Sequence, residues 1–463
     1  AKILAEDIAR GGGSVAIINI DERPDEIEDE RAKGVCILQG DARSPGILRS
    51  AGLLRAANLV CMTDQDETNV AILESARTII EAAEVSGSAP REFNCYCHIT
   101  NWHLRNHLEQ LIFTQSKTKG MRCRLFNIDE TTAAEVLVRF PPERYVPLER
   151  LHDSVHVALL GGDRLAQAMA TELALLGHYW RADPNSEAQP RTRLSIVSAD
   201  AEYVVQQLRN MCPNVDLLLD LVAIPFDPVD ASVLAQLADG KWGPISQYYV
   251  ALHDEVATLA LTTLMQTAVT KSGDTAIGRV AAILPPGTLH IDPEVWCKNH
   301  LIGVFDAYES CTEAVVIGGA KDRMAMSAHQ SYFETAQKNG RAPGSRPAMY
   351  PWSDLSEFLR ESNRKQVAHI AVKARALGWQ ICDGTSDDAT EIGDELPIIS
   401  DEMIEQLAET EHRRWMAFYL IHGWIPAQKF NDSLREHDCL VPYVKLSEEM
   451  KGYDRDIVRN MFS

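Results

Sequence analysis

The sequence predicts an α/β protein with parallel sheets in two tandem units, followed by a mainly α-helical domain. Short apolar runs of strand length alternate with helical stretches up to about residue 286, which is typical of βαβ units. Residues 156–180, HVALLGGDRLAQAMATELALLGHYW, pass from an apolar strand through a glycine turn into a helix. Residues 411–422 instead show helical spacing, and Gly423 marks the end of that helix.

The length and the charge limit the organisation and the partners. A chain of 463 residues is expected to hold about three domains. We expect a first unit at residues 1–145, a second at 152–286, a connecting region at 287–349 and the helical domain at 350–463. The net charge of −21, from 45 basic and 66 acidic residues, opposes nonspecific binding to nucleic acid. No nucleic-acid partner is therefore expected.

Cysteine usage and hydropathy predict a cytoplasmic chain. The ten cysteines include no C-x-x-C pair, which fits a reducing compartment. No apolar run approaches the about 18 residues that span a bilayer. Cys95, Cys97 and His98 stand close together in FNCYCHIT, which alternates like a strand. They are either buried strand residues or metal ligands, and we expect the former and no metal site.

The first unit begins inside a helix, with Leu4 and Ile8 on one face. Strands are predicted at residues 15–20 and 35–38, with a charged helix between them. In a Rossmann unit, a strand and a glycine-rich turn precede the first helix. Neither is present, so we expect that the given sequence starts just after the phosphate-binding turn.

Residues 40–73, GDARSPGILRSAGLLRAANLVCMTDQDETNVAIL, resemble the N-terminal domain of potassium-transport regulators, the TrkA-N or RCK family. The resemblance implies a Rossmann domain that binds NAD(H) or an adenine nucleotide and regulates a channel or transporter. It places Asn19 and Asp21 at the ribose, Gly40, Asp41 and Ala42 beside the adenine, and Thr63 and Asp64 at the phosphates. A carboxylate at a strand end can accept both ribose hydroxyls. Alternatively, these are turn residues of a fold without a ligand.

The second unit has a degenerate glycine motif. Against G-x-G-x-x-G it reads Gly161, Gly162, Asp163, then RLA. Asp163 replaces the glycine that lets the backbone approach a pyrophosphate, and it adds a negative charge there. Later strands are predicted near residues 193–198, 222–224, 248–252 and 280–284. We expect a structural or dimerising unit without a dinucleotide, and a homo-oligomer.

The C-terminal part resembles the ryanodine-receptor repeat (RyR) domain, which also occurs in bacterial and phage proteins. The matching words are LAETEHRRW, HGW, LVPY and KGYDRDIVR, in this order between residues 407 and 459. The segment RESNRKQVAHIAVKARALGW, upstream, resembles the stretch that precedes the repeat. One departure is that Ile425, Pro426 and Ala427 follow HGW where the family often has Tyr-Gly.

Aromatic and basic residues of this part suggest a pocket for a purine nucleotide. Trp415 or Trp424 would stack on the base, and Trp424, in a loop after a glycine, is the better candidate. Arginines and a lysine would bind phosphates. The candidate ligand residues are Trp415, Trp424, Arg413, Arg414, His412, Asn363, Arg364, His369, Lys373 and Tyr443. The alternative is that the tryptophans are core residues and the arginines pair with Glu409 and Glu411.

The motifs favour sensing over catalysis. The sequence contains no nucleophile elbow, P-loop, zinc box or paired catalytic carboxylates, so we expect no enzyme and no catalytic residue. We predict a cytosolic nucleotide-sensing regulatory module of a membrane ion channel or transporter, with a pore segment upstream. The alternatives are a soluble bacterial anti-phage or signalling sensor that recognises a (cyclic) nucleotide without a pore, and, ranked last, a nucleotide-processing enzyme.

Overall fold

The computed structural model describes residues 1–20, 31, 33–87, 93–115, 121–147, 150–151, 155–181, 191–271, 279–285, 302–318, 320–379 and 399–461. The chain forms two compact units: unit 1 comprises Ala1–Thr132 and Ala307–Ala320, and unit 2 comprises Ala133–Asp306 and Lys321–Ser463. Among the described helices, none combines the length and the hydropathy that crossing a bilayer requires.

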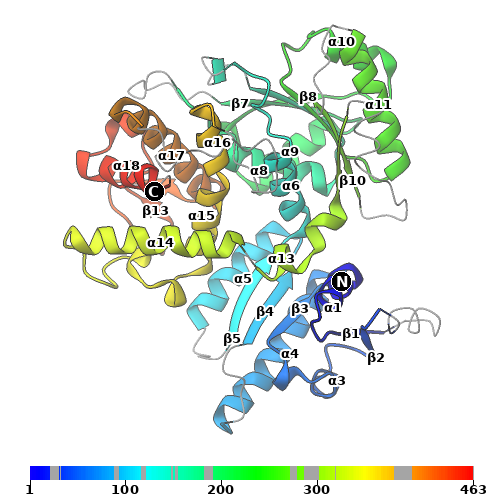
Figure 1. Ribbon diagram of the computed structural model, residues 1–463, viewed down its shortest axis with the longest axis vertical. Coiled ribbons are helices and arrows are strands. Elements are labelled where there is room, and N and C mark those ends of the chain that lie inside the picture. The colour runs from blue at the N-terminus through cyan, green and yellow to red at the C-terminus, as the bar shows by residue number, and fades with distance from the viewer. Residues whose placement is uncertain are drawn as a thin grey trace. The chain divides into compact units, whose positions relative to one another are not determined.

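Unit 1 contains two parallel sheets (Figure 1). Strand β1 (Ala16–Asn19) pairs with β2 (Cys36–Gln39). Strands β3 (Asn58–Cys61), β4 (Phe93–His98) and β5 (Met121–Phe126) form the second sheet in that order. The helices are α1 (Lys2–Arg10), α3 (Pro45–Ser50), α4 (Asp66–Val85), α5 (Trp102–Gln115) and α6 (Ile128–Arg139), which leads into unit 2. Ile18 and Ala42 pack against the buried cluster of the second sheet, so the two sheets share a core.

A late segment of the chain completes unit 1. The 3-10 helix η4 (Ala307–Cys311) and the short helix α13 (Glu313–Val316) follow the last strand of unit 2. Val316 is buried with Leu4, Tyr96 and Phe126, and the Tyr96 hydroxyl donates to the Ile317 carbonyl at 2.6 Å. Unit 1 therefore includes a helical segment that lies far along the sequence from the rest of the unit.

Unit 2 is built on a six-stranded parallel sheet in the order β11-β10-β9-β6-β7-β8. The strands are β6 (His156–Leu160), β7 (Thr192–Val197), β8 (Leu219–Ile224), β9 (Gln247–Val250), β10 (Val280–Leu284) and β11 (Gly303–Asp306). This is the 3-2-1-4-5-6 order of a Rossmann fold, with the switch point between β6 and β9. Strand β11 comes from the region that the sequence assigned to the connection. The predicted fold class, with parallel sheets and a helical C-terminal part, is confirmed.

The helices next to this sheet are α8 (Arg164–Leu176), α9 (Ala201–Met211), α10 (Ala231–Ala238) and α11 (Glu255–Lys271). Helix α8 is amphipathic in sequence, yet nearly all of its residues are buried, including Thr171 and Glu172. The reason is that α15 and α17 of the C-terminal part pack against it, as well as the sheet. A helix buried on both faces must find partners for its polar side chains.

The C-terminal part is mainly helical (Figure 1, yellow to red). It contains α14 (Ala320–Lys338), α15 (Glu357–Ala368), α16 (Ile370–Ala376), α17 (Asp401–Ile421) and α18 (Glu448–Met461). Two short strands, β12 (Ile425–Pro426) and β13 (Glu436–His437), lie between α17 and α18. Ser400 begins α17 because its hydroxyl accepts from the Met403 N–H. Gly423 (φ 79°) follows its end, as the sequence predicts.

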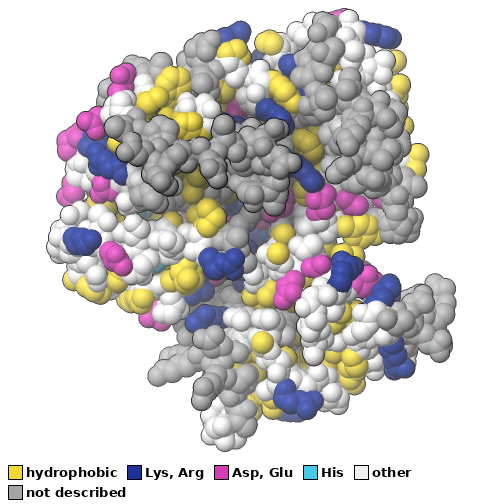
Figure 2. All heavy atoms as spheres, in the orientation of Figure 1, with side chains coloured by type: hydrophobic (Ala, Val, Ile, Leu, Met, Phe, Trp, Pro, Cys, Tyr) yellow, Lys and Arg dark blue, Asp and Glu magenta, His cyan; other side chains and the backbone are white. Residues whose placement is uncertain are grey.

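Charges of both signs cover the described surface. Figure 2 shows Lys or Arg and Asp or Glu side chains interspersed on the face in view. This face accompanies a net charge of −21 for the whole chain.

Candidate functional site

In unit 1, a buried asparagine holds the loops that follow β3 and β4. Asn69 lies in the first turns of α4 and is fully buried. Its Oδ1 accepts from the Thr63 N–H at 2.8 Å. Its Nδ2 donates to the Thr63 carbonyl at 3.1 Å and to the His98 carbonyl at 2.9 Å. One side chain therefore fixes the ends of two neighbouring strands relative to each other.

Asp66 reinforces this arrangement from the first turn of α4. Its carboxylate accepts from the N–H groups of Thr100 and Asn101, each at 2.8 Å. The Thr100 hydroxyl donates to the same carboxylate at 3.1 Å. Asp64 stays exposed in the turn between β3 and α4. We call Thr63, Asp64, Thr100 and Asn101 the strand-end rim, which the Asn69 and Asp66 side chains order in advance of any ligand.

The other predicted nucleotide residues of unit 1 lie at the ends of β1 and β2. The Gly40 N–H donates to the Asn19 carbonyl at 2.9 Å, so these two residues are neighbours. The Asp41 carboxylate pairs with the Arg43 guanidinium at 2.7 Å, and hydrogen bonds from Arg43 lower the pKa of Asp41. Ala42 packs into the core together with Cys61 at the end of β3. Asp21 lies outside the described residues.

The glycine turn of unit 2 is closely packed and capped by a carboxylate. A Cβ on Gly161 would lie 2.0 Å from the Ala251 carbonyl oxygen, and one on Gly162 would lie 2.7 Å from Ser198 Oγ. The Asp163 Oδ1 accepts from the Ala166 N–H at 3.0 Å and caps α8. A pyrophosphate would need this helix N-terminus for itself. The geometry therefore favours the expectation that unit 2 holds no dinucleotide at this turn.

The two predicted tryptophans of the C-terminal part differ in accessibility. Trp424 is 6 % exposed. Its ring lies nearly parallel to those of Phe358 (24°, 6.0 Å) and Phe430 (25°, 5.8 Å). A base could stack on it only by displacing one of these rings. Trp415 is half-buried, with Tyr419 at 4.5 Å. The geometry therefore favours Trp415 over Trp424 as a stacking ring, because Phe358 and Phe430 lie against the Trp424 ring.

The predicted phosphate-binding cations are paired inside unit 2. Glu411 binds Lys373 at 2.5 Å and Arg414 at 2.7 Å, and all three side chains are 0–1 % exposed. Arg413 donates to the Tyr179 carbonyl at 3.0 Å and lies 3.7 Å from Glu409. A phosphate would have to break these buried pairs. The alternative in which Glu409 and Glu411 pair with the arginines agrees with this geometry.

The remaining candidates of the C-terminal part also make internal contacts. His369 Nε2 donates to the His178 carbonyl at 2.9 Å, and His412 Nε2 donates to the Val441 carbonyl at 2.8 Å. Burial alone would lower the pKa of His412, but the Asp454 carboxylate outweighs it and raises that pKa. The other contacts are Arg364 to Asp322 (2.5 Å), Asn363 to the Leu359 carbonyl (2.7 Å) and the Tyr443 hydroxyl to Glu405 (3.0 Å). These side chains hold the fold together.

One residue that the sequence did not single out lies beside Trp415. His437 is buried, with the Trp415 ring at 4.9 Å. Its Nδ1 accepts from the Cys439 N–H at 3.1 Å, so the neutral ring carries its proton on Nε2. Burial lowers the pKa of His437 to about 4, and the nearby charge of Arg346 acts in the same direction. The sequence feature that could have pointed to His437 is its position three residues before the LVPY word.

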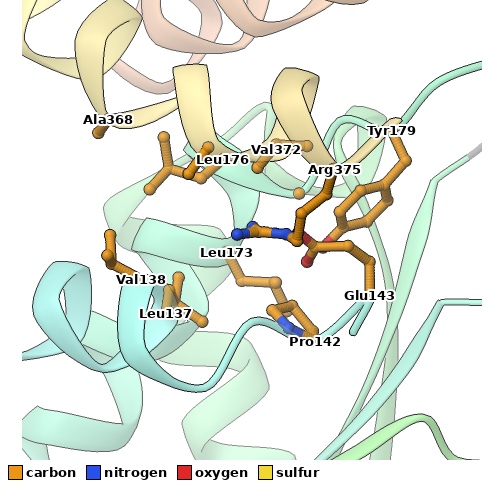
Figure 3. Close-up of a pocket in the computed structure, with 12 residues that line it drawn as sticks. Leu137, Val138, Pro142, Glu143, Leu173, Leu176, Tyr179, Ala368, Val372 and Arg375 are labelled. Atoms are coloured by element: carbon orange, nitrogen blue, oxygen red, sulfur yellow. Dashed lines mark hydrogen bonds and ion pairs between the residues drawn. The ribbon is translucent and has the colours of Figure 1, made fainter. Parts of the chain in front are cut away.

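A cavity of about 20 Å³ lies between the end of α6, α8 and α16 (Figure 3). Its lining is mostly apolar, and the Arg375 Nε donates to Glu143 Oε1 at 2.6 Å on its wall. This volume holds about one water molecule. The cavity is therefore too small to be a nucleotide site.

Comparisons with known proteins confirm both resemblances. The family model described as TrkA-N domain matches residues 1–92, and the one described as RyR domain matches residues 392–463. No curated protein matches the chain. Two similar solved structures are crystal structures of GsuK, one bound to ADP and one of a mutant, each 11 % identical. Their TM-scores are 0.41 and 0.42, and the match covers 67 % of this chain. It spans 64 % and 63 % of those chains, less than two thirds of their length. The present chain thus carries a TrkA-N domain at residues 1–92 and a RyR domain at residues 392–463.

Proposed function

We propose that the chain is a nucleotide-sensing regulatory module in which an adenine nucleotide or NAD(H) binds along the ends of β1 and β2 and at the strand-end rim of unit 1. The observation that carries this proposal is the fixation of the rim by the buried side chain of Asn69. A site that is ordered before binding loses less conformational entropy when the ligand arrives. The TrkA-N match, residues 1–92, includes β1, β2 and β3 and ends just before β4.

The contrast between the two units supports this choice. In unit 2 the carboxylate of Asp163 occupies the helix N-terminus that a pyrophosphate needs. In unit 1, Asn19 has its Oδ1 engaged by the Ile20 N–H at 2.8 Å. Its Nδ2 would then donate to a ribose hydroxyl. Unit 1 is therefore the nucleotide-binding unit of the proposal, and unit 2 is a scaffold for the RyR domain.

Isothermal titration of the full chain with ADP, NAD⁺ and NADH tests this proposal. We expect Asn19→Ala and Asp21→Ala each to weaken binding of the preferred nucleotide about tenfold, because each removes hydrogen bonds to a ribose. Asp200→Ala is the matched control, since Asp200 is exposed just after β7, the corresponding strand of unit 2. Unchanged affinity in both unit 1 variants, or an equal loss in the control, would contradict the proposal.

A second ligand site of the same module is proposed in the RyR domain and the segment before it, around Trp415, His437 and Arg346. Trp415 offers a half-buried aromatic face. The His437 Nε2–H faces no acceptor among the described residues, and burial keeps this ring neutral at pH 7. Arg346 is exposed and has no described acidic partner. A stacking ring, a neutral donor and a cation suit a purine nucleotide.

This second site is tested by fluorescence titration with ADP-ribose and with cyclic AMP. We expect Arg346→Ala and Trp415→Leu to weaken binding about tenfold, and Trp415→Leu to remove most of the ligand-induced quenching. Lys429→Ala is the control, because Lys429 is an exposed cation of the same domain. Loss of binding in the control, or full binding by both variants, would refute the site without affecting the proposal for unit 1.

The partner in this proposal is a membrane ion channel or transporter, to which the module transmits nucleotide binding. The support is the TrkA-N match, which was also the basis of the sequence prediction. The complete coding sequence of the natural gene provides a test. Two or more apolar segments of about 20 residues there, or nucleotide-dependent potassium flux of the gene product, would support it. A gene product that stays in the soluble fraction would favour the sensor without a pore.

A further inference from the structure

Four cysteines occupy one face of the three-stranded sheet of unit 1. Cys61 lies on β3, Cys95 and Cys97 lie on β4, and Cys123 lies on β5. Cys95 and Cys97 are two residues apart, so their side chains leave β4 on the same face. The strand register pairs Cys61 with Cys97 and Cys95 with Cys123. All four belong to the same core cluster, Cys123 at its edge.

The paired positions have the spacing that a disulfide requires. Neighbouring strands lie about 4.8 Å apart, and the Cα atoms of disulfides lie about 4.4–6.8 Å apart. Residues in register on parallel strands also point their Cβ atoms to the same side. The thiols are already in contact, since the Sγ atoms of Cys61 and Cys95 are 4.0 Å apart. This contact joins Cys61 to its diagonal neighbour Cys95, so the side chains must turn before the register partners Cys61 and Cys97 can bond.

Cys61 is the candidate nucleophile of the cluster. Hydrogen bonds from the thiols of Cys95 and Cys97 lower its pKa to about 5, although burial opposes this. A thiolate is the reactive form of cysteine toward peroxides. The pKa of Cys95, by contrast, is raised by its neighbouring thiols and by burial. The cluster therefore combines one nucleophile with neighbours that can resolve it.

We propose that this face of the sheet is a thiol oxidation site, at which hydrogen peroxide converts the pairs Cys61–Cys97 and Cys95–Cys123 into disulfides. The Cys61 thiolate attacks one peroxide oxygen, and the O–O bond breaks to give a sulfenic acid and, after protonation, water. The Cys97 sulfur then attacks the Cys61 sulfur, and the hydroxyl leaves as a second water. For each disulfide, two thiols lose two electrons and two protons and one peroxide is reduced to two water molecules, so a second peroxide oxidises the Cys95–Cys123 pair by the same two steps.

The position of the site links oxidation to ligand binding, a step that rests on the proposed function. Cys61 is two residues before Thr63 of the strand-end rim, and Cys97 directly precedes His98, whose carbonyl binds Asn69. A bond between Cys61 and Cys97 would cross-link the ends of β3 and β4 and so restrain the strand-end rim. We expect the affinity of the oxidised chain for its nucleotide to change at least threefold.

Peptide mass spectrometry of the folded full chain tests the site. The protein is treated with hydrogen peroxide, remaining thiols are blocked with N-ethylmaleimide, and the digest is searched for linked peptides. We expect Cys61–Cys97 and Cys95–Cys123 links that disappear with dithiothreitol. Cys97→Ala should remove the first link and leave the second. Cys212→Ala is the control, since Cys212 is a buried cysteine of unit 2, and it should leave both.

Three outcomes would overturn the proposal. The four thiols would stay reduced while the exposed Cys36 is oxidised, or the links would form only in urea, or Cys61 would link to Cys95 against the strand register. Circular dichroism confirms that each variant is folded. If the links form but nucleotide affinity stays the same, the oxidation site stands and its regulatory effect is refuted. If no nucleotide binds, the proposed function fails and the mass spectrum still decides the site.

Discussion

Lys373 and Glu411 form an ion pair of 2.5 Å from which water is excluded, since the two side chains are 0 % and 1 % exposed. The Glu411 carboxylate also binds Arg414, so it serves two buried cations on α16 and α17. Removing such charges from water is costly, and their mutual attraction roughly offsets that cost. The network therefore specifies how these helices pack more than it adds net stability.

Loss of the shared carboxylate should be strongly destabilising. Glu411→Gln leaves Lys373 and Arg414 buried without a counter-charge, which costs about 3–5 kcal/mol of the free energy of unfolding. Urea denaturation followed by circular dichroism measures it. The control is Glu449→Gln, which removes a pair with Arg341 in which Glu449 is 72 % exposed. We expect less than about 1 kcal/mol there, and equal losses in both variants would contradict the argument.

Much of the fold is predictable because buried parallel strands leave a local pattern in the sequence. Continuous apolar runs predicted the strands at residues 156–160 and 280–284, which the structure has as β6 and β10. Gly423 predicted the end of α17, because its φ of 79° suits glycine. Such signals act over a few residues and need no knowledge of tertiary partners.

The C-terminal site was harder to predict because its chemistry depends on distant partners. Charged residues are usually exposed, so HRR in α17 suggested cations that are free to bind the phosphates of a ligand. Helix α17 instead packs against α8, α15 and α18, and its polar face is covered as well. The counter-charges Glu409 and Glu411 lie on the same helix. The spacing of apolar residues predicts one buried face of a helix, and it does not predict that a polar face is buried as well.

Acid should destabilise unit 2 through His178. Burial, and then the charge of Arg413, lower the pKa of this side chain to about 3. The unfolded chain takes up a proton near pH 6.5 that the folded chain cannot, so stability is lost as the pH falls from 6.5 toward 3. The loss between pH 6.5 and 5 is about 2 kcal/mol. Urea unfolding at pH 6.5 and at pH 5 measures this loss in the wild-type protein and in His178→Gln. The loss of unfolding free energy should be about 2 kcal/mol smaller in His178→Gln. An equal loss in both proteins would contradict the assignment to His178.

Two glycine-to-alanine substitutions should have opposite effects on stability. Gly161→Ala places a Cβ 2.0 Å from the Ala251 carbonyl, at a φ of 141°, and we expect a loss of about 3 kcal/mol or more. Gly452→Ala lies inside α18, where a Cβ meets no atom within 4 Å. It should stabilise by about 0.5–1 kcal/mol, because alanine is the better helix former. Thermal melts compare the two, and a stable Gly161→Ala protein would show that the turn is not tight.

Substitutions of Trp415 and of Trp424 should differ in their effect on the free energy of unfolding and on the quenching of tryptophan fluorescence. Trp424→Ala removes a ring between Phe358 and Phe430 and should cost about 3–5 kcal/mol of the free energy of unfolding. Trp415→Ala should cost only about 1–2 kcal/mol, because this ring is partly exposed in the folded protein and buries less apolar surface. Acrylamide quenching gives an independent measure. Trp415→Phe should reduce the quenchable part of the emission, and Trp424→Phe should reduce the shielded part.

The same pair of substitutions decides between the two views of the RyR site. If a ligand stacks on Trp415, its titration should quench the emission of Trp424→Phe protein and leave that of Trp415→Phe unchanged. The opposite pattern would mean that Phe358 or Phe430 moves aside and that Trp424 is the stacking ring. Displacing either phenyl ring would expose apolar surface at about 25 cal/mol per Å², so we expect the ligand to use Trp415, the more exposed of the two rings, on the side away from His412.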